Sequence, residues 1–388
     1  MGINISSNYI PAININTGIS VSGILSVISN SFYDVTNYQT VNITKPEDLL
    51  ETRLNTPLQV TSYNNDNLTY IAPYTFYNTG IISASFPVCT SIGGYAFYSC
   101  SSLTTANFPV CTTIDGYAFY CCSSLTTASF PDALSIGISA FHSCRALSVA
   151  NFPSCTTIWS SAFYSCSSLT EANFPVCSYI YQGAFKSCSA LSSINFLSCK
   201  SLYSEVFSGC SSLISASFPA CTSISDKVFY GCRSLTLADF PLCTRIGKSA
   251  FGYCSYLSTI NFPACTYIDS SAFFQCLYSL FSVNFPVCST INVSAFFNCR
   301  VMSVASFPAC YTIESGAFGG CYTLLSLYLS GSKVCFLRNS NAFSGTPIAG
   351  YTESTSGVYG SIYVPASLYS SYIASTNWVN FSSRFVSV

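Results

Sequence analysis

The fold of this chain is decided by the stretch Leu103-Thr-Thr-Ala-Asn-Phe-Pro-Val-Cys111-Thr-Thr-Ile114-Asp-Gly-Tyr-Ala118-Phe119-Tyr-Cys-Cys122, which recurs with small edits from about residue 80 to about residue 345. The phenylalanine of its Phe-Pro step recurs every 22 residues, with one step of 23, at Phe86, Phe108, Phe130, Phe152, Phe174, Phe196, Phe218, Phe240, Phe262, Phe285 and Phe307. A fixed period of this length predicts a solenoid of stacked repeats and excludes a single globular core.

Each repeat divides into a strand, a turn and a return. Ala106 and Phe108 alternate with Thr105 and Asn107, which predicts a strand with one buried face. The apolar residues that follow the turn lie at offsets of 0, 4, 8 and 11 residues, at Ile114, Ala118, Cys122 and Leu125. This spacing predicts a short helical or turn-like return with one apolar face. No repeat can bury its apolar face alone, so neighbouring copies must bury one another. Stacked in parallel, the strands would form one long sheet on the concave side of the solenoid.

The segments on either side of the repeats predict a three-part organisation. Residues 1–57 lie outside the period and are expected to form an N-terminal cap or an attachment region. Ile13, Ile15, Ile19 and Val21 alternate with polar residues there, as in short strands, and residues 44–53 are typical of a capped helical turn. A degenerate copy at residues 58–79 begins the solenoid, which is expected to span residues 58–348 with about 12 repeats. Residues 349–388, with Trp378, are expected to form a C-terminal cap.

The composition excludes several classes of function. A net charge of −1 with 7% charged residues leaves no basic surface for nucleic acid. Half of the residues are apolar, but no run of 18 apolar residues indicates a membrane span. Residues 1–8 show no standard secretion signal. The low charge and the many tyrosines also favour self-association, so we consider a homo-oligomer or an assembly partner held through residues 1–57.

The composite Leu-x-x-Ala/Ile-x-Phe-Pro-x-Cys-x-x-Ile-x-x-x-Ala-Phe-x-x-Cys-x-x-Leu resembles the BspA-like class of bacterial leucine-rich repeats over residues 58–348. The resemblance implies an α/β repeat solenoid, a right-handed superhelix with a parallel concave sheet and short helical or turn returns. It also implies adhesion at a cell surface by binding protein or glycan, without catalysis. The composite is similar as well to repeat proteins encoded among phage structural genes, which implies a virion or phage-tail location as the alternative.

Of the 23 cysteines, all but Cys121 and Cys335 fall into two periodic series, one containing Cys89 and Cys111 and the other Cys100 and Cys122. The first series lies in the turn, where a small side chain can bond to the backbone, and the second lies on the apolar face of the return. We therefore expect buried free thiols, rather than disulfides or a metal site. Cys121 belongs to neither series and is expected to be more exposed. Cys335 is assigned to the position of Ile114 in the repeat, as an apolar filler.

Two surfaces are candidate ligand sites. The first is the strand strip, the outward positions of the predicted strands, which carry amides, hydroxyls and two acids at Thr105, Asn107, Asn151, Glu171, Asn173, Asn195, Asp239, Asn261 and Asn284. It is either a solvated face with asparagine ladders or a hydrogen-bonding groove for a sugar or peptide. The second is the aromatic rim, one residue after the buried Phe of each return, at Tyr98, Tyr120, Tyr164, Tyr230, Phe274 and Phe297, with His142 in the series. These rings either meet a ligand or pack against one another.

The sequence contains no recognisable catalytic chemistry. We find no nucleophile elbow, phosphate-binding glycine loop, zinc-protease motif or calcium loop, and acids such as Asp115 and Asp269 occupy different repeat positions. No enzyme activity, cofactor or metal is therefore expected. The sequence predicts a binding or adhesion protein, extracellular or on a cell surface, whose partner is a protein or a glycan. The alternative is a structural or receptor-binding subunit of a phage tail or surface assembly.

Overall fold

The computed structural model describes residues 66–350 and 359–388, and the backbone of seven short strands before them. Those strands are β1 (Asn4–Ile5), β2 (Asn8–Tyr9), β3 (Ser20–Val21), β4 (Leu25–Val27), β5 (Phe32–Asp34), β6 (Gln39–Val41) and β7 (Val60–Asn64). Val21 thus lies in a strand as expected, whereas the other alternating isoleucines and the helical turn expected at residues 44–53 lie outside the described residues. The chain divides into two compact units, residues 1–195 and residues 196–388.

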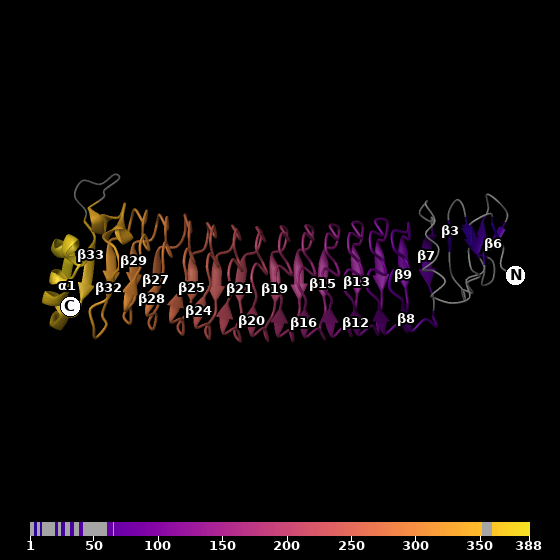
Figure 1. The fold of residues 1–388 in the computed structure, drawn as a ribbon, viewed down its shortest axis with the longest axis horizontal. Coiled ribbons are helices and arrows are strands. Elements are labelled where there is room, and N and C mark those ends of the chain that lie inside the picture. The colour runs from indigo at the N-terminus through magenta and orange to yellow at the C-terminus, as the bar shows by residue number, and fades with distance from the viewer. Residues whose placement is uncertain are drawn as a thin grey trace. The chain divides into compact units, whose positions relative to one another are not determined.

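The repeats of the first unit each contribute two short strands, and equivalent strands of successive copies pair in parallel (Figure 1). The two-residue strands form one continuous ladder. The three-residue strands were expected to form one long sheet, but their pairing is interrupted between residues 129 and 149, so they belong to two sheets. The three-residue strands are β9 (Ser83–Ser85), β11 (Thr105–Asn107), β13 (Thr127–Ser129), β15 (Val149–Asn151), β17 (Glu171–Asn173) and β19 (Ser193–Asn195). The two-residue strands are β8 (Tyr70–Ile71), β10 (Ser91–Ile92), β12 (Thr113–Ile114), β14 (Ser135–Ile136), β16 (Thr157–Ile158) and β18 (Tyr179–Ile180). Pairing joins equivalent residues of successive copies, such as Ala106 with Ala128 and Ile92 with Ile114.

The second unit repeats this arrangement. Its three-residue strands are β21 (Ser215–Ser217), β23 (Leu237–Asp239), β25 (Thr259–Asn261), β27 (Ser282–Asn284), β29 (Val304–Ser306) and β31 (Ser326–Tyr328). Its two-residue strands are β20 (Ser201–Leu202), β22 (Ser223–Ile224), β24 (Arg245–Ile246), β26 (Tyr267–Ile268), β28 (Thr290–Ile291), β30 (Thr312–Ile313) and β32 (Phe336–Leu337). Both units are therefore solenoids of parallel strands, as the period predicts.

A Phe-Pro step ends most of the three-residue strands. The amide of Phe108 still donates to the carbonyl of Ser129 in the next repeat, at 3.1 Å. Pro109 has no amide to continue the ladder and occupies the second position of a β-turn, which the Cys111 amide closes on the Phe108 carbonyl at 3.2 Å. The Cys111 thiol then donates to the carbonyl of Thr113 at 3.3 Å. The first cysteine series therefore bonds to the backbone within the turn, as expected from the sequence.

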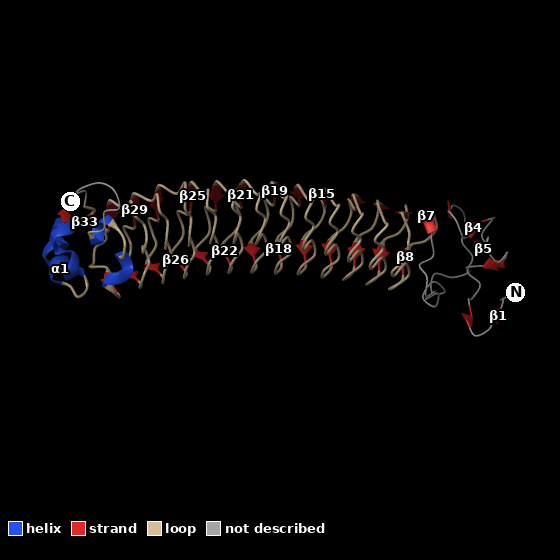
Figure 2. Cartoon of the chain, turned by 90° about the horizontal axis from the view of Figure 1, so that it is seen from above, coloured by secondary structure: helices blue, strands red, loops and turns tan. Residues whose placement is uncertain are grey.

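The return of each repeat is built of turns, the second of the two forms that the sequence allowed. The amides of Tyr117, Phe119 and Cys121 donate to carbonyls of the following repeat, at 2.7–2.8 Å. These amides cannot also donate to carbonyls four residues earlier in their own repeat, so an α-helix does not form. Figure 2 shows the repeats as strand and loop, with helix drawn only in the C-terminal part of the second unit.

Two turns in each return place a residue in the left-handed region of backbone conformation. In the first turn, the left-handed residue directly precedes the buried Ala-Phe pair, as Tyr117 does with a φ of 61°. In the second turn, the left-handed residue lies two positions after the Phe, as Cys121 does with a φ of 59°. Serine or glycine occupies the first of these positions in most repeats, at Ser139, Ser161, Gly183, Ser249, Ser271, Ser294 and Gly316. The backbone requirement explains this choice, because bulky side chains are disfavoured there.

The core of each unit consists of two columns of phenylalanine rings. In the first unit, one column comes from the Phe-Pro steps and includes Phe108 and Phe130, whose centroids lie 5.2 Å apart. The other comes from the Ala-Phe pairs and includes Phe119 and Phe141, 5.1 Å apart. Rings of different columns meet edge to face, as Phe119 and Phe130 do at 5.7 Å. The degenerate copy belongs to this core, because Phe76 stacks on Phe97 at 4.8 Å.

A C-terminal segment closes the second unit. The 3-10 helices η2 (Ser340–Phe343) and η3 (Pro347–Ala349) end the last repeat. Residues 359–388 then form β33 (Ser361–Val364), η4 (Ala366–Leu368), α1 (Tyr369–Ala374), η5 (Trp378–Arg384) and β34 (Phe385–Ser387). Strand β33 extends the ladder of β31, and the fully buried Trp378 lies 5.8 Å from Phe343 of the last repeat.

The structure corrects the position assigned to Cys335. Strand β32 pairs with β30 so that Leu337, and not Cys335, lies opposite Ile313. The Ile114 position of the last repeat is therefore filled by Leu337. The sequence assignment was wrong because Ile313 and Leu337 are 24 residues apart instead of 22, so two additional residues precede β32 in this repeat. Cys335 instead lies beside the turn cysteine of the preceding repeat, with its sulfur 3.6 Å from that of Cys310.

All 23 cysteines carry free thiols, and each is buried except Cys121, which is half-buried. Thiols of the second series donate across repeats, as Cys122 does to the carbonyl of Phe97 at 3.0 Å. Burial raises the pKa of Cys122 well above that of an ordinary thiol. The Cys122 thiol is therefore both inaccessible and protonated at neutral pH.

The burial of the thiols predicts how many of them react in the native protein. Fully reduced native protein should react with a thiol reagent such as dithionitrobenzoate at about one site, Cys121, while protein in concentrated guanidinium should react at all 23 cysteines. Cys121→Ser should abolish the fast native reaction and leave the unfolded count lower by one. Several fast native thiols in the Cys121→Ser variant would contradict the burial of the two series.

Candidate functional site

The strand strip has the alternation expected from the sequence. Thr105 and Asn107 are exposed, whereas Ala106 between them is 2% exposed. The same exposed–buried–exposed order recurs in β15, β21 and β27. The residues proposed from the sequence thus lie on the outward face of the three-residue strands, at Thr105, Asn107, Asn151, Glu171, Asn173 and Asn195 in the first unit and at Asp239, Asn261 and Asn284 in the second.

The amides of the strand strip bond to one another in both units. Nδ2 of Asn173 donates to Oδ1 of Asn151 at 2.7 Å, and Nδ2 of Asn195 donates to Oδ1 of Asn173 at 2.8 Å. In the second unit, Nδ2 of Asn261 donates to Oδ1 of Asp239 at 2.7 Å. These bonds form the asparagine ladder that was one of the two interpretations of the strip. Part of its hydrogen-bonding capacity is therefore used within the fold.

The aromatic rim forms a continuous column of stacked rings in the first unit. Tyr98 and Tyr120 are stacked with centroids 4.8 Å apart, and Tyr77 precedes them at 5.0 Å from Tyr98. His142 follows Tyr120 at 4.6 Å and Tyr164 follows His142 at 4.7 Å. Because each ring face is covered by the next ring, the rim presents ring edges and hydroxyl groups, and a flat ligand cannot insert between the rings.

A second column of tyrosines, not predicted from the sequence, lies beside the first. Tyr74, Tyr95 and Tyr117 stack with centroids 4.9 and 4.8 Å apart. Each one contacts the rim tyrosine of its own repeat at 5.6–5.7 Å, as Tyr95 contacts Tyr98. The detectable signal was the recurrence of Tyr-x-Phe-Tyr at residues 74–77, 95–98 and 117–120.

Together these six residues form a surface that we call the tyrosine array, Tyr74, Tyr77, Tyr95, Tyr98, Tyr117 and Tyr120. Tyr74 and Tyr77 are 44% and 45% exposed and the other four are half-buried. Burial raises the pKa of Tyr98 and of Tyr120, followed by the neighbouring Tyr120 for Tyr98 and the neighbouring Cys121 for Tyr120. These two hydroxyls therefore stay protonated at neutral pH, and the array is a surface of apolar rings and hydrogen-bonding groups.

His142 continues the aromatic column and has no catalytic partner. Its Nδ1 lies 3.0 Å from the hydroxyl of Ser143, and its ring lies between those of Tyr120 and Tyr164. Burial lowers the pKa of His142, so its imidazole is neutral at pH 7. Its contacts are those of one more ring in the column.

The rim of the second unit is less regular. Tyr230 meets Tyr253 edge to face at 5.2 Å, and Tyr253 meets Phe274 in the same way at 5.4 Å. Phe274 and Phe297 are stacked at 5.6 Å. Glycine replaces an aromatic residue at Gly252 and Gly319, where an added Cβ would lie 2.9–3.1 Å from the ring of the preceding repeat. The rim residues proposed for this unit are therefore not brought into one column.

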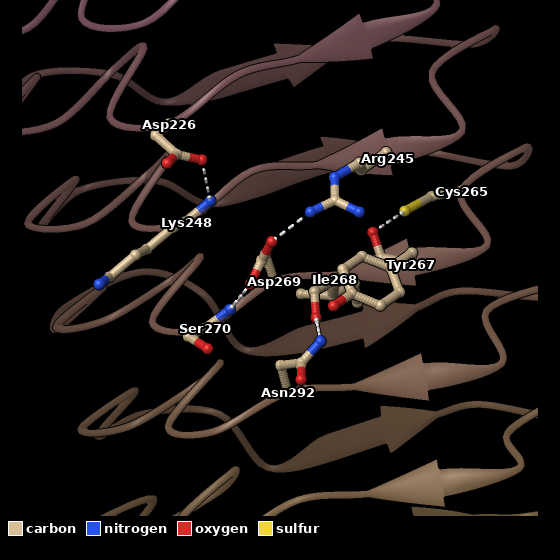
Figure 3. A network of polar contacts seen from close by, with 9 residues as sticks. All are labelled: Asp226, Arg245, Lys248, Cys265, Tyr267, Ile268, Asp269, Ser270 and Asn292. Atoms are coloured by element: carbon tan, nitrogen blue, oxygen red, sulfur yellow. Dashed lines mark hydrogen bonds and ion pairs between the residues drawn. The ribbon is translucent and has the colours of Figure 1, made fainter.

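The second unit carries a cluster of charged residues around β24 and β26 (Figure 3). Nη2 of Arg245 lies 2.6 Å from a carboxylate oxygen of Asp269, and its guanidinium lies 4.4 Å from the centroid of Tyr267. The backbone amide of Lys248 donates to Asp226 at 2.9 Å, and that of Ser270 donates to Asp269 at 2.7 Å. These acids fix turns and pair with a cation, so the cluster supports the repeats and offers no acid–base pair.

The described residues offer no site for a metal or a membrane helix. Among residues 66–350 and 359–388, no group of three or more His, Cys, Asp or Glu side chains is placed to hold a metal ion. Within the same residues, every helix is too short or too polar to cross a bilayer.

Comparisons with known proteins agree with the repeat. A family model described as "BspA type Leucine rich repeat region (6 copies)" matches residues 4–111, 26–148, 69–192, 134–257 and 222–349. No curated protein matches the chain significantly.

Several solved structures are similar. A leucine-rich repeat protein from Bacteroides ovatus is 21% identical over 69% of this chain and 86% of its own, with a TM-score of 0.41. A leucine rich cell surface protein from Faecalibacterium prausnitzii is 19% identical over 95% and 96%, with a TM-score of 0.39. The leucine rich repeat protein of T. pallidum is 27% identical over 41% and 85%, with a TM-score of 0.37.

The matches to the family model overlap and together span residues 4–349, which is most of the chain. The chain belongs to the BspA-type leucine-rich repeat family.

Proposed function

We propose that this protein is a non-enzymatic binding protein of the extracellular space or a cell surface, and that it recognises a protein or a glycan through the tyrosine array. The observation that carries the proposal is the presence of tyrosine at positions 74, 95 and 117, all in the left-handed region with φ of 61–63°. The equivalent turns at Ser139 and Ser161 have the same backbone without a bulky side chain.

Folding alone gives little reason for tyrosine at these three positions. A non-glycine residue in the left-handed region costs about 1–2 kcal/mol, and a stacked aromatic pair contributes only about 0.5–1.5 kcal/mol. Serine bears the same backbone cost, so tyrosine differs from it only by the packing of its ring, and the turns at Ser139 and Ser161 form without that ring. A ring that the turn does not require, on a half-exposed surface, is available to a partner.

The chemistry of the array suits a neutral partner surface. Tyrosine offers a large rigid contact area and a hydroxyl, and it is enriched where interfaces concentrate their binding energy. No Asp, Glu, Lys or Arg belongs to the array, so binding would depend little on salt. The strand strip, including Asn151, Asn173 and Asn195, remains the second proposed surface.

A double substitution tests the array. The variant combines Tyr95→Ser with Tyr117→Ser. Serine already occupies the equivalent turn position at Ser139 and Ser161, so the fold should persist. We expect wild-type protein to be captured saturably by at least one of bacterial cells, envelope polysaccharide, mucin or a matrix protein. Capture of the variant should fall about tenfold or more, since central interface tyrosines commonly contribute over 1 kcal/mol each.

The matched control is Tyr256→Ser with Tyr278→Ser, which removes two tyrosines that are 53% and 55% exposed in the second unit. This control should bind as the wild type does. Equal capture of all three proteins would exclude the array as the binding surface. Failure of wild-type protein to bind any of the four probes would favour the structural alternative, a subunit of a phage tail or surface assembly attached through residues 1–57.

A further inference from the structure

We infer that Cys310 and Cys335 form a disulfide when the protein meets an oxidising environment, and that this bond staples the C-terminal segment to the last repeats. The inference does not depend on the proposed binding function. Its basis is the arrangement of these two thiols at the C-terminal end of the second unit, where the regular cysteine ladder is interrupted.

The two sulfurs are already in contact. Sγ of Cys335 lies 3.6 Å from Sγ of Cys310, and the two side chains belong to adjacent rungs around β30 and β32. A disulfide bond is about 2.05 Å long, so the sulfurs must approach by about 1.5 Å. Rotation of the two side chains can supply this movement without breaking the pairing of Thr312 with Phe336.

The Cys335 thiol also lacks the close backbone acceptor that other turn cysteines have. Cys111, Cys155 and Cys243 each donate to the carbonyl two residues later, at 3.1–3.3 Å. The carbonyl nearest to the Cys335 sulfur is that of Phe336, at 3.9 Å. Turning the two sulfurs towards each other therefore sacrifices the 3.9 Å contact of Cys335 and the 3.5 Å contact of Cys310 with the carbonyl of Thr312, both longer than the bonds of the three regular turn thiols.

Thiols also meet elsewhere in the second unit, but in a closed environment. Cys299 interacts with Cys276 and with Cys321, and all three are fully buried. Each of them also donates to a phenylalanine carbonyl, as Cys321 does to Phe296 at 3.1 Å. Repeats cover these thiols on both sides, so an oxidant would have to separate stacked repeats to reach them.

The Cys310–Cys335 pair is covered instead by the C-terminal segment. The hydroxyl of Tyr372 accepts a hydrogen bond from the Cys335 amide at 2.9 Å. The indole Nε1 of Trp378 donates to the Cys335 carbonyl at 2.7 Å. These two bonds fix the backbone of Cys335, and undocking of the segment during folding or fluctuation would expose both sulfurs.

The oxidant is a small disulfide such as oxidised glutathione. A thiolate of the pair attacks one sulfur of the small disulfide, forms a mixed disulfide and releases one small thiolate. The second protein thiolate then attacks the protein sulfur of that mixed disulfide and releases the other small thiolate. Two protons leave the protein thiols, two electrons pass to the small disulfide, and one Cys310–Cys335 bond forms.

The test uses the full chain, which is purified in its reduced form and incubated with oxidised glutathione. The remaining free thiols are then alkylated in denaturant, and the disulfide-linked peptides are mapped. The expected product links the peptides of Cys310 and Cys335 and has two fewer titratable thiols than the 23 of the reduced chain. The midpoint of thermal unfolding should rise by several degrees and return to its original value after dithiothreitol. Trp378→Ala should form the same bond faster, because it loosens the segment that covers the pair.

Two cysteine variants control for disulfides formed elsewhere in the chain. Cys335→Ser should give neither the linked peptide nor the thermal shift, whereas Cys299→Ser should give both. The inference is overturned if the linked peptides come from other cysteines, if Cys335 stops at the glutathione adduct, or if neither the wild type nor Trp378→Ala forms the bond. Refolding the guanidinium-unfolded chain in a glutathione redox buffer repeats the test with both thiols accessible, and absence of the bond there would also overturn it.

Discussion

Replacing Phe119 with alanine is expected to lower the free energy of unfolding by about 3–5 kcal/mol. The Phe119 ring is fully buried and lies between Phe97 at 4.9 Å and Phe141 at 5.1 Å in its own column. Alanine would leave a cavity that the neighbouring rings cannot fill, because the hydrogen bonds between repeats fix their spacing. Urea unfolding of the full chain, followed by circular dichroism, measures the loss.

The effect should also be local. In a solenoid each repeat contacts only its neighbours, so hydrogen exchange should accelerate most in the repeats that contain residues 97–141. Phe119→Leu is the matched control, since it retains most of the apolar volume and should cost less than about 1.5 kcal/mol. A uniform acceleration over both units, or equal losses for the two variants, would contradict the description of the core as stacked rings.

Replacing Trp378 with alanine is expected to have a similar cost, about 3–5 kcal/mol, at the end of the second unit. Trp378 is fully buried among aromatic rings, with Phe343 at 5.8 Å and Tyr372 at 5.7 Å. Its indole also donates to the carbonyl of Cys335 at 2.7 Å. The variant therefore removes the apolar contact and leaves a buried acceptor without its donor. Proteolysis should cleave residues 359–388 of the variant first.

Trp378→Phe separates these two contributions. Phenylalanine keeps most of the ring packing but has no N–H group, so its cost should be about 1–3 kcal/mol, that of an unsatisfied buried carbonyl. Thermal unfolding of both variants checks the order. If Trp378→Phe and Trp378→Ala were equally unstable, the hydrogen bond to Cys335 would account for the whole effect, and the packing argument would be wrong.

The sequence could predict the strands and the core because both follow from the period. A buried residue such as Phe108 recurs at a fixed place in every copy, and parallel stacking puts equivalent residues opposite one another. The form of the return could not be fixed in the same way. Offsets of 0, 4, 8 and 11 residues fit a helix as well as turns, and only the bonds from Tyr117, Phe119 and Cys121 to the next repeat decide between them.

The candidate surfaces were predictable only in part. Alternation placed Asn151 and Asn173 on the outward face correctly, but it carried no information on their mutual hydrogen bond. The rim was found through Tyr98 and Tyr120 because they follow the Ala-Phe pair. Tyr95 and Tyr117 were missed because they occupy the position before the Ala-Phe pair, which is serine or glycine in most copies. The sequence pattern also does not reveal that the backbone at this position lies in the left-handed region. Similarly, the two additional residues between Ile313 and Leu337 concealed the contact between Cys335 and Cys310.

The central claim is that the tyrosine array binds a partner, and the most direct measurement compares the two candidate surfaces in one titration. Three fluorescently labelled proteins are titrated over immobilised mucin, deglycosylated mucin and envelope polysaccharide. They are the wild type, the Tyr95→Ser/Tyr117→Ser variant and an Asn151→Arg/Asn173→Arg/Asn195→Arg variant. We predict saturable binding that the tyrosine variant loses and the arginine variant keeps, with the deglycosylated arm separating glycan from protein recognition. Loss of binding in the arginine variant alone would assign the site to the strand strip and contradict the account.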